Sequence, residues 1–312
     1  MYLLGFDIGG TKCAAVTANW DGETIELLEK KQIKTDHTQS PDAVIDRLMD
    51  LADGLLLHTP DTIGISCGGP LDSQKGIILG PPNLPGWDHV EIVQRIRSHY
   101  GAPTHLQNDA NACAVAEWKF GAGRGTNNMI FLTFGTGLGA GLILNGTLYE
   151  GTNGNAGEVG HIRLAETGPV GYGKIGSFEG FCSGGGIAQL ALQIANEQPT
   201  RPLYYPIGAN SEDVTAKSVA DAAMAGDPIA LEVFRISGSY LGKGLSLLID
   251  ILNPERIVIG SIFARSRSLL WESARAEIER EALPFSASCC QVLPAELGDQ
   301  IGDYAAIATA LL

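Results

Sequence analysis

Charged side chains are scarce in this sequence, at 18% of 312 residues against the roughly 25% of an average globular protein. The charge that is present is mostly negative, with 21 Lys and Arg against 35 Asp and Glu and a net charge of −14. A chain with this excess of acid repels phosphate backbones, so we expect no general binding of nucleic acid. Because 45% of the residues are hydrophobic, a disordered chain is excluded as well.

The sequence also lacks any uninterrupted apolar run near the ~20 residues that cross a bilayer. Its first residues, Met1 to Asp7, contain no basic side chain and soon reach an acidic one, unlike a secretory signal peptide. The six cysteines are scattered without the spacing of a disulfide framework, so we expect buried, reduced thiols. We therefore expect a cytoplasmic protein with no membrane partner.

Glycine is the residue in excess, with 40 in the chain and no collagen-like period. This number indicates tight turns and places where the backbone closely approaches a ligand.

The hydrophobic pattern alternates strands with helices and predicts an α/β fold with mixed sheets. Ser40 followed by Pro41 is typical of the start of a helix, which Val44, Leu48 and Leu51 continue at helical spacing. Strands are expected at residues 2–6, 13–17, 25–32, 62–66, 104–107, 128–134, 140–144, 256–259 and 291–293. Helices are expected at residues 41–55, 90–100, 111–120, 185–195, 216–225, 228–252, 266–281 and 304–312.

The sharpest chemical signal is the segment Asp7-Ile8-Gly9-Gly10-Thr11-Lys12, which joins two predicted strands. Main-chain N–H groups at glycines can close around phosphate oxygens, the Thr11 hydroxyl can donate to them, and Lys12 adds positive charge. Asp7 ends the first strand, where a carboxylate is well placed to hold hydrated Mg²⁺ beside phosphates. The alternative is an ordinary glycine-rich hairpin turn.

A second turn, Gly135-Thr136-Gly137-Leu138-Gly139, also joins two strands, so the pattern of residues 2–17 recurs at residues 128–144. The recurrence indicates a duplicated architecture with two facing phosphate loops. The same glycines superficially match a dinucleotide fingerprint, but that fingerprint opens a helix, and here a strand follows. No suitable acid follows about 20 residues on, which also argues against a nicotinamide-dependent oxidoreductase.

In this order the motifs resemble the ROK family (repressors, open reading frames and sugar kinases), within the actin-like ATPase superfamily that includes hexokinases. The resemblance covers nearly the whole chain. Besides the phosphate motifs at residues 7–12 and 133–139, it rests on Ser66-Cys67-Gly68-Gly69-Pro70, Pro82-Asn83-Leu84 with Trp87, Asn108-Asp109-Ala110-Asn111-Ala112, Glu158-Val159-Gly160-His161 and Asn253-Pro254-Glu255-Arg256-Ile257-Val258-Ile259-Gly260. Each segment alone is a weak to moderate signal, and their order is a strong one.

The resemblance implies two actin-like (ribonuclease H-like) lobes with a cleft between them. The first lobe is expected at residues 1–115, with the C-terminal helix of about residues 300–312 packing back on it. The second lobe is expected at residues 116–299. A homodimer is a further expectation from the family.

The resemblance also implies a sugar site and a nucleotide site. Asp109 would be the base that accepts the proton of the attacking hydroxyl, although an Asp there is also typical of a helix N-cap. The residues expected at the sugar are Gly69, Asn83, Asn108, Asp109, Glu158, His161 and Glu179. Those expected at ATP are Asp7, Gly9, Gly10, Thr11, Lys12, Gly135, Thr136, Gly137, Gly185 and Gly260, with Mg²⁺ held near Asp7 through water.

One segment departs from the family pattern. Members typically carry three cysteines that bind structural zinc together with the His of the Glu-x-Gly-His signature. Here the corresponding positions hold Val170, Tyr172 and Ser177. Because these side chains cannot supply thiolates, we expect no zinc, and His161 is then free to serve the sugar.

These observations predict an ATP-dependent kinase of a glucose-like hexose, with O6 as the acceptor that the resemblance implies. The alternatives are a kinase of an N-acetylhexosamine or a glycoside, and a non-catalytic sugar-binding sensor. The family's repressors carry a helix-turn-helix before the first phosphate motif. Since that motif begins here at residue 7, we expect no DNA-binding domain, and sugar and nucleotide as the partners.

Overall fold

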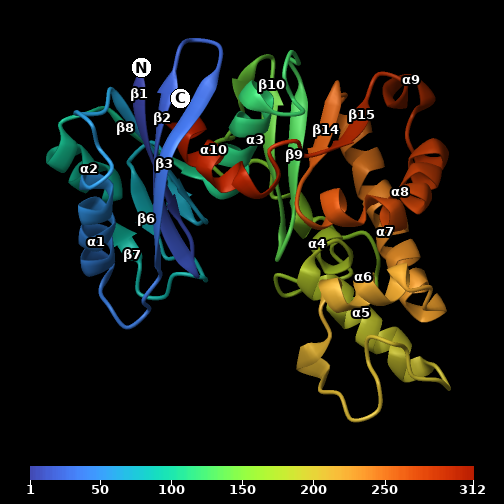
Figure 1. Ribbon diagram of the computed structural model, residues 1–312. Coiled ribbons are helices and arrows are strands. Elements are labelled where there is room, and N and C mark those ends of the chain that lie inside the picture. Colours follow the sequence, from blue (N-terminus) through green and yellow to red (C-terminus); the bar gives the residue numbers. More distant parts are fainter. The chain divides into compact units, whose positions relative to one another are not determined.

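Four crossings of the chain divide the protein into two units, which can be followed in Figure 1. The computed structural model describes residues 1–312 throughout. Unit 1 contains Met1–Gly125, Gly141–Ala156 and Glu296–Leu312. Unit 2 contains Thr126–Ala140 and Gly157–Ala295.

Unit 1 is built on a five-stranded sheet in the order β3-β2-β1-β4-β8. Its strands are β1 (Tyr2–Ile8), β2 (Lys12–Trp20), β3 (Ile25–Lys34), β4 (Thr62–Cys67) and β8 (Thr104–Asn108). Strands β1, β2 and β3 form an antiparallel meander, whereas β1, β4 and β8 run parallel. The register pairs Ile8 with Cys67 and Cys67 with Asn108, so the three parallel strands end side by side.

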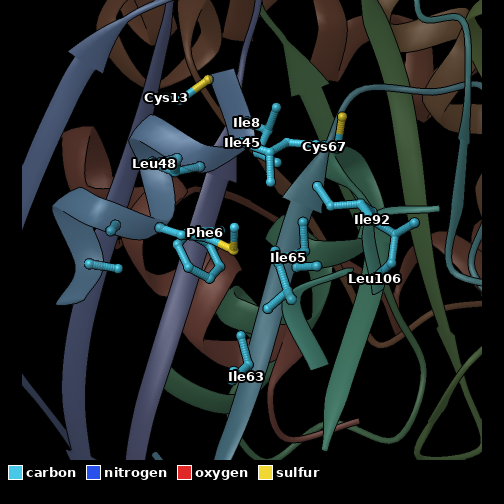
Figure 2. Close-up of a cluster of buried hydrophobic side chains, with 14 of the residues drawn as sticks. Phe6, Ile8, Cys13, Ile45, Leu48, Ile63, Ile65, Cys67, Ile92 and Leu106 are labelled. Carbon is cyan, nitrogen blue, oxygen red and sulfur yellow. The ribbon is translucent and has the colours of Figure 1, made fainter. Parts of the chain in front are cut away.

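One face of this sheet carries the main core of unit 1. Leu4, Phe6 and Ile8 alternate along β1 and pack with helices α1 (Pro41–Asp53) and α2 (Ile92–Tyr100). Figure 2 shows Phe6 and Ile8 in this cluster among side chains from β4 and both helices. Alternation places these residues on one face because successive strand residues point to opposite sides.

The opposite face of the sheet packs against the C-terminal helix α10 (Ile301–Thr309). Gly5 and Gly64 are neighbours in register on β1 and β4. A Cβ at Gly5 would lie 2.9 Å from the Ala306 Cβ, and one at Gly64 would lie 2.1 Å from the Ala306 carbonyl oxygen. The two glycines therefore let this alanine-rich helix approach the sheet at backbone distance, where Leu3 and the helix residue Ile307 join a second core.

Helix α3 (Asp109–Phe120) is tied to the segment that enters α10 by a buried carboxylate. Glu117 has no exposed surface and accepts N–H groups from Ala122, Glu296 and Leu297 at 2.8, 3.2 and 2.9 Å. Hydrogen bonds to a charged acceptor offset the cost of burying it. A small antiparallel sheet of β5 (Leu71–Asp72), β6 (Ile77–Leu79) and β7 (Asp88–Val90) and the short η3 (Gly298–Gln300) also belong to unit 1.

A second five-stranded sheet has the order β11-β10-β9-β14-β15. Its parallel strands β9, β14 and β15 belong to unit 2. A unit boundary falls within β10, so β11 belongs to unit 1. The strands are β9 (Met129–Phe134), β10 (Leu138–Leu144), β11 (Thr147–Leu148), β14 (Arg256–Ile259) and β15 (Gln291–Pro294). The helices are α4 (Phe178–Phe181), α5 (Gly184–Glu197), α6 (Ala216–Met224), α7 (Pro228–Leu252), α8 (Ile262–Glu281) and α9 (Pro284–Ala287). The short elements are η1 (Val159–His161), η2 (Ser211–Asp213) and the hairpin of β12 (Val170–Gly171) with β13 (Lys174–Ile175).

The predicted α/β class is confirmed, and β14 and α7 have the predicted bounds. The prediction of one helix over residues 90–100 is wrong at its start, because Val90 ends β7 and pairs with Ile78, and α2 begins at Ile92. The pattern also does not predict the β12–β13 hairpin or helix α9. These pieces are two to four residues long, which is too short for a periodic hydrophobic pattern to reveal them.

The six cysteines are free thiols that differ in exposure. Cys13, Cys67 and Cys182 are buried, as expected, and burial raises the pKa of Cys67 and Cys182. The expectation of burial is wrong for Cys289, which is exposed in the turn after α9.

No helix in the structure combines the length and the apolar character that crossing a bilayer requires.

Candidate active site

Three loops with predicted functions begin at the same edge of the unit 1 sheet. Because Ile8, Cys67 and Asn108 are paired in register, the segments that follow them start side by side. These segments are the first phosphate motif, the loop of Gly69 and the start of α3 with Asp109. The carboxyl ends of parallel strands are the usual position of ligands in α/β sheets.

The turn between β1 and β2 is a tight hairpin, as predicted. The Gly9 N–H donates to the Lys12 carbonyl at 3.1 Å, and the side chains of Thr11 and Lys12 are exposed. A Cβ at Gly10 would lie 2.3 Å from the carbonyl oxygen of Asn83. Only glycine at position 10 therefore lets the loop of Asn83 contact this turn.

Asp7 lies just before the turn, with its carboxylate against the start of α10. A Cβ at Gly302 would lie 2.8 Å from Oδ2 of Asp7. The next helix residue, Asp303, is 6% exposed and is paired with Lys30 at 2.6 Å. Burial raises the pKa of Asp7 to about 6, the negative charges of Asp303 and Asp109 add to the rise, and Lys30 opposes it.

Asn108 and Asp109 stand at the start of α3. Asn108 is the N-cap, and its Oδ1 accepts the Ala110 N–H at 2.9 Å. Asp109 is the first residue of the helix, is exposed, and accepts the same N–H at 2.8 Å through its own Oδ1. The interpretation of Asp109 as the N-cap is therefore wrong, because Asn108 fills that position.

The other predicted sugar residues of unit 1 are close by. A Cβ at Gly69 would lie 2.9 Å from Nδ2 of Asn108, and one at Gly68 would lie 3.4 Å from Oδ1 of Asn83. Unit 1 thus brings together Asp7, the turn of residues 9–12, Gly69, Asn83, Asn108 and Asp109.

In unit 2 the turn between β9 and β10 meets the start of α5. The Gly135 N–H donates to the Gly137 carbonyl at 3.1 Å, and the Gly135 carbonyl accepts the Gly184 N–H at 2.8 Å. Thr136 and Gly185 are exposed, and nothing lies within 4 Å of a Cβ built at Gly185. The Gly135 and Gly184 N–H groups are used in these bonds, which place the turn with its exposed Thr136 next to the N-terminus of α5. The positive end of a helix dipole at such a position favours an anion.

Gly260 follows β14 and is buried. Its N–H donates to the Leu132 carbonyl at 3.0 Å, so this amide belongs to the sheet. The exposed neighbour Ser261 has φ 52°, and its Oγ lies 3.4 Å from a Cβ built at Gly135. Ser261 rather than Gly260 thus carries the polar group beside the second turn.

The Glu158-Val159-Gly160-His161 signature forms η1, which packs on the start of β10. A Cβ at Gly160 would lie 2.1 Å from the Leu138 carbonyl oxygen and 3.2 Å from the Cβ of Glu179. Glu179 accepts the Leu138 N–H through Oε2 at 3.0 Å, while Glu158 and His161 are exposed. Unit 2 therefore brings Glu158, His161 and Glu179 together beside the second phosphate turn.

The β12–β13 hairpin and the residues after it hold the three positions where the family's zinc-binding cysteines would stand. Val170 and Tyr172 are 40% and 76% exposed. Ser177 is buried, and its Oγ accepts the Gly180 N–H at 3.1 Å and donates to the Gly171 carbonyl at 3.4 Å. Structural zinc needs thiolate or imidazole ligands, and these positions offer an aliphatic side chain, a phenol and a hydroxyl that is already hydrogen-bonded. No group of three or more His, Cys, Asp or Glu is arranged to hold a metal ion.

Hydrogen bonds hold this hairpin in place. The Gln189 side chain accepts the Val170 N–H at 3.0 Å and donates to the Val170 carbonyl at 2.9 Å. The Lys174 ammonium donates to the His161 carbonyl at 2.7 Å, which ties the hairpin to η1. The His161 and Tyr172 rings meet edge to face with centroids 6.4 Å apart.

Sequence reasoning missed the groups around Asp7 and beside the second turn, namely Lys30, Asp303 and Ser261. Lys30 on β3 and Asp303 on α10 are 273 positions apart, and no local pattern links them. Ser261 directly follows the predicted segment that ends at Gly260, and its left-handed backbone is not visible in the sequence.

Two α/β lobes that each place a glycine-rich turn between adjacent strands define an actin-like ATPase fold. The family model of the ROK family matches residues 3–311, and the chain belongs to this family. The resemblance noted from the motifs is thereby confirmed.

Relatives of known function include kinases and repressors. A glucokinase of Streptomyces coelicolor is 31% identical over 304 residues, covering 96% of this chain and 94% of the relative. A crystal structure of a ROK family glucokinase from Streptomyces griseus, in complex with glucose and AMPPNP, has a TM-score of 0.79 and 30% identity, covering 100% of this chain and 99% of that one. A xylose repressor of Bacillus spizizenii is 26% identical over 304 residues, covering 95% of this chain and 73% of the repressor.

Proposed function

We propose that this protein is a sugar kinase that transfers the γ-phosphoryl group of ATP to O6 of a glucose-like hexose. The observation that carries the proposal is the shared sheet edge of unit 1, where a phosphate-type turn and the exposed carboxylate of Asp109 follow two parallel strands that only β4 separates. The likeness to the Streptomyces griseus glucokinase, whose complex contains glucose and AMPPNP, supports the same substrates.

Asp109 acts as the base in this proposal. Its carboxylate accepts the proton of the sugar hydroxyl as the hydroxyl oxygen bonds to the γ-phosphorus and the bond to the departing ADP oxygen breaks. The first turn of α3 holds the carboxylate, because one oxygen already accepts the Ala110 N–H. Asn108, Asn83 and the Gly69 backbone add the mixed donors and acceptors that sugar hydroxyls require.

Unit 2 supplies further groups for sugar and nucleotide. Glu158, His161 and Glu179 offer acceptors and a ring nitrogen to sugar hydroxyls. The amide groups of the second phosphate turn and of the α5 N-terminus stabilise negative charge on the phosphates. Mg²⁺ prefers one carboxylate, water and phosphate oxygens, so the Asp7 carboxylate suits it as a ligand. Mg²⁺ bound there would neutralise charge on the phosphates.

The likeness to the xylose repressor supports one alternative, a sugar-binding sensor that transfers no phosphoryl group. A kinase of an N-acetylhexosamine or a glycoside is a second alternative within the same chemistry. A substrate panel separates all three.

The experiment is a coupled ADP-release assay with ATP and Mg²⁺ across glucose, mannose, fructose, allose, glucosamine, N-acetylglucosamine, N-acetylmannosamine and a methyl glucoside, where turnover confined to the glycoside moves the assignment to glycosides. Turnover on a free hexose supports the proposal, and phosphorus NMR of the product locates the acceptor oxygen. Turnover confined to an N-acetylhexosamine moves the assignment to that class. Sugar-dependent thermal stabilisation without turnover on any member refutes the kinase and favours the sensor.

A further inference from the structure

A buried glutamine lies directly before the proposed base. Gln107, at the end of β8, is 2% exposed. Its Oε1 accepts the main-chain N–H of Asn108 at 2.8 Å and the Asn111 side-chain N–H at 3.1 Å. The main-chain donor orients the amide, because only the oxygen of Gln107 can face an N–H. Its Nε2 must then find an acceptor elsewhere.

That acceptor is Glu150, which follows β11. Oε1 of Glu150 accepts the Gln107 N–H at 3.0 Å and the Ser73 hydroxyl at 2.7 Å. The main-chain carbonyl of the same residue accepts the Ala156 N–H at 3.0 Å. Glu150 therefore contacts three segments that are far apart in the sequence and all lie in unit 1.

Each of the three segments leads to a proposed sugar residue within a few positions. Ser73 follows the Gly69 loop, and Gln107 precedes Asn108 and Asp109. The loop of residues 151–156, which Glu150 closes, runs directly into Glu158. The side-chain carboxylate and the main-chain carbonyl of Glu150 thus join the chain segments that carry the proposed sugar contacts.

We propose that Glu150 and Gln107 are positioning residues for the sugar site, and that they hold Asn108, Asp109 and the Gly69 loop in their productive geometry. This inference rests on the proposed kinase function. Neither residue carries out proton transfer, and both act through the backbone of their neighbours. Small misplacements of reacting groups cost large factors in rate, so loss of this network should lower sugar turnover.

Variants of these residues can be ranked by how many of the Glu150 contacts each one removes. Glu150→Ala removes the acceptor of both Gln107 and Ser73, whereas Glu150→Gln keeps one amide oxygen for the same two donors. Ser73→Ala removes one donor only. Glu272→Ala, on an exposed face of α8, is the matched control, because it changes the same side chain away from these contacts.

The kinetic test measures kcat and the KM of each substrate. For Glu150→Ala we expect the sugar KM to rise about tenfold and kcat to fall about tenfold, with the ATP KM unchanged, because the network contacts the sugar segments. Glu150→Gln should recover most of both losses. Ser73→Ala should have a smaller effect alone and none in the Glu150→Ala background, since its acceptor is then gone.

Equal changes in the KM of sugar and ATP, or kinetics of Glu150→Ala that match Glu272→Ala, would overturn the inference. A second measurement needs no activity. Hydrogen exchange of the Asn108 amide should speed up in Glu150→Ala, because its acceptor Gln107 loses its own partner, and should stay unchanged in Glu272→Ala. The Ala156 amide keeps its acceptor, the main-chain carbonyl of residue 150, and serves as an internal reference. If wild type phosphorylates no sugar, the proposed function fails, and the exchange data alone decide whether Glu150 holds these segments.

Discussion

At the scale of single residues, two aspartates at one sheet edge have contrasting surroundings. Asp7 is partly buried and lies against α10 near Asp303, whereas Asp109 is exposed on the first turn of α3. An exposed carboxylate can meet a substrate hydroxyl. A partly buried one with a raised pKa is better suited to a bound cation, which offsets the cost of its charge.

Asp109→Asn tests the assignment of the base. The amide keeps the size and the helix contact but cannot take a proton, so we expect kcat to fall about 10²- to 10⁴-fold with little change in the sugar KM. Steady-state kinetics on the best sugar of the panel provide the measurement. Asp221→Asn, on the exposed side of α6, is the control. Near-normal turnover of Asp109→Asn would show that another group is the base.

Asp7 should make the free energy of unfolding depend on pH. Its pKa rises from the usual 3.8 to about 6, so between these values the folded chain binds more protons than the unfolded one. Stability from this group is therefore complete below pH 3.8 and is lost as the pH rises through about 6.

Asp7→Asn, which carries no charge, should then be more stable than wild type at pH 7, by at most about 3 kcal/mol, and equal to it near pH 4. Urea unfolding without ligands across this pH range measures the difference. We also expect the variant to lose activity. A stability difference that does not vary with pH would contradict the role given to burial.

At the scale of elements, the β12–β13 hairpin shows how side-chain hydrogen bonds can secure a loop. Gln189 pairs with both main-chain groups of Val170, and Lys174 ties the hairpin to His161. Each such bond contributes about 1 kcal/mol net. Together these bonds give the loop before Glu179 a fixed attachment without thiolates.

Treatment with EDTA followed by restored Mg²⁺ should therefore leave sugar turnover and melting temperature unchanged. The physical reason is that the side chains at the three positions offer no thiolate, so no structural zinc is available to be removed. Metal analysis of the purified protein and the activity before and after treatment check this. Stoichiometric zinc, together with a lower melting temperature after its removal, would contradict the prediction.

At the scale of the whole molecule, the charge balance bears on the choice between kinase and repressor. The net charge of −14 opposes the approach of a phosphate backbone, and salt-dependent contacts to phosphates dominate DNA affinity. Because a xylose repressor is among the relatives of this chain, DNA binding is the property that distinguishes the two functions.

We expect the chain of residues 1–312 to show no binding of a labelled DNA duplex even at about 50 mM salt, where electrostatic attraction is strong. Fluorescence anisotropy with and without the preferred sugar provides the measurement, with a basic DNA-binding protein as the positive control. Saturable binding that weakens with added salt would favour a repressor-type function.

Local chemistry accounts for the parts of the fold that the sequence predicts well. Ser40 with Pro41 starts α1, and Asp227 with Pro228 starts α7, because these residues satisfy the first N–H groups of a helix or need no N–H there. The glycine turns after β1 and β9 and the order of the motifs were likewise sufficient to recognise the ROK family, which the family comparison confirms.

The tertiary structure alone decided which of these local pieces meet. The register of β1, β4 and β8 places the first phosphate turn and Asp109 at the same edge of the sheet, and packing against α10 brings Asp303 and Lys30 to Asp7. Glu150 reaches Gln107 and Ser73 across 43 and 77 positions of sequence. Propensity and periodicity act over a few residues, whereas these contacts arise only when distant segments pack into one unit, so no local pattern could predict them.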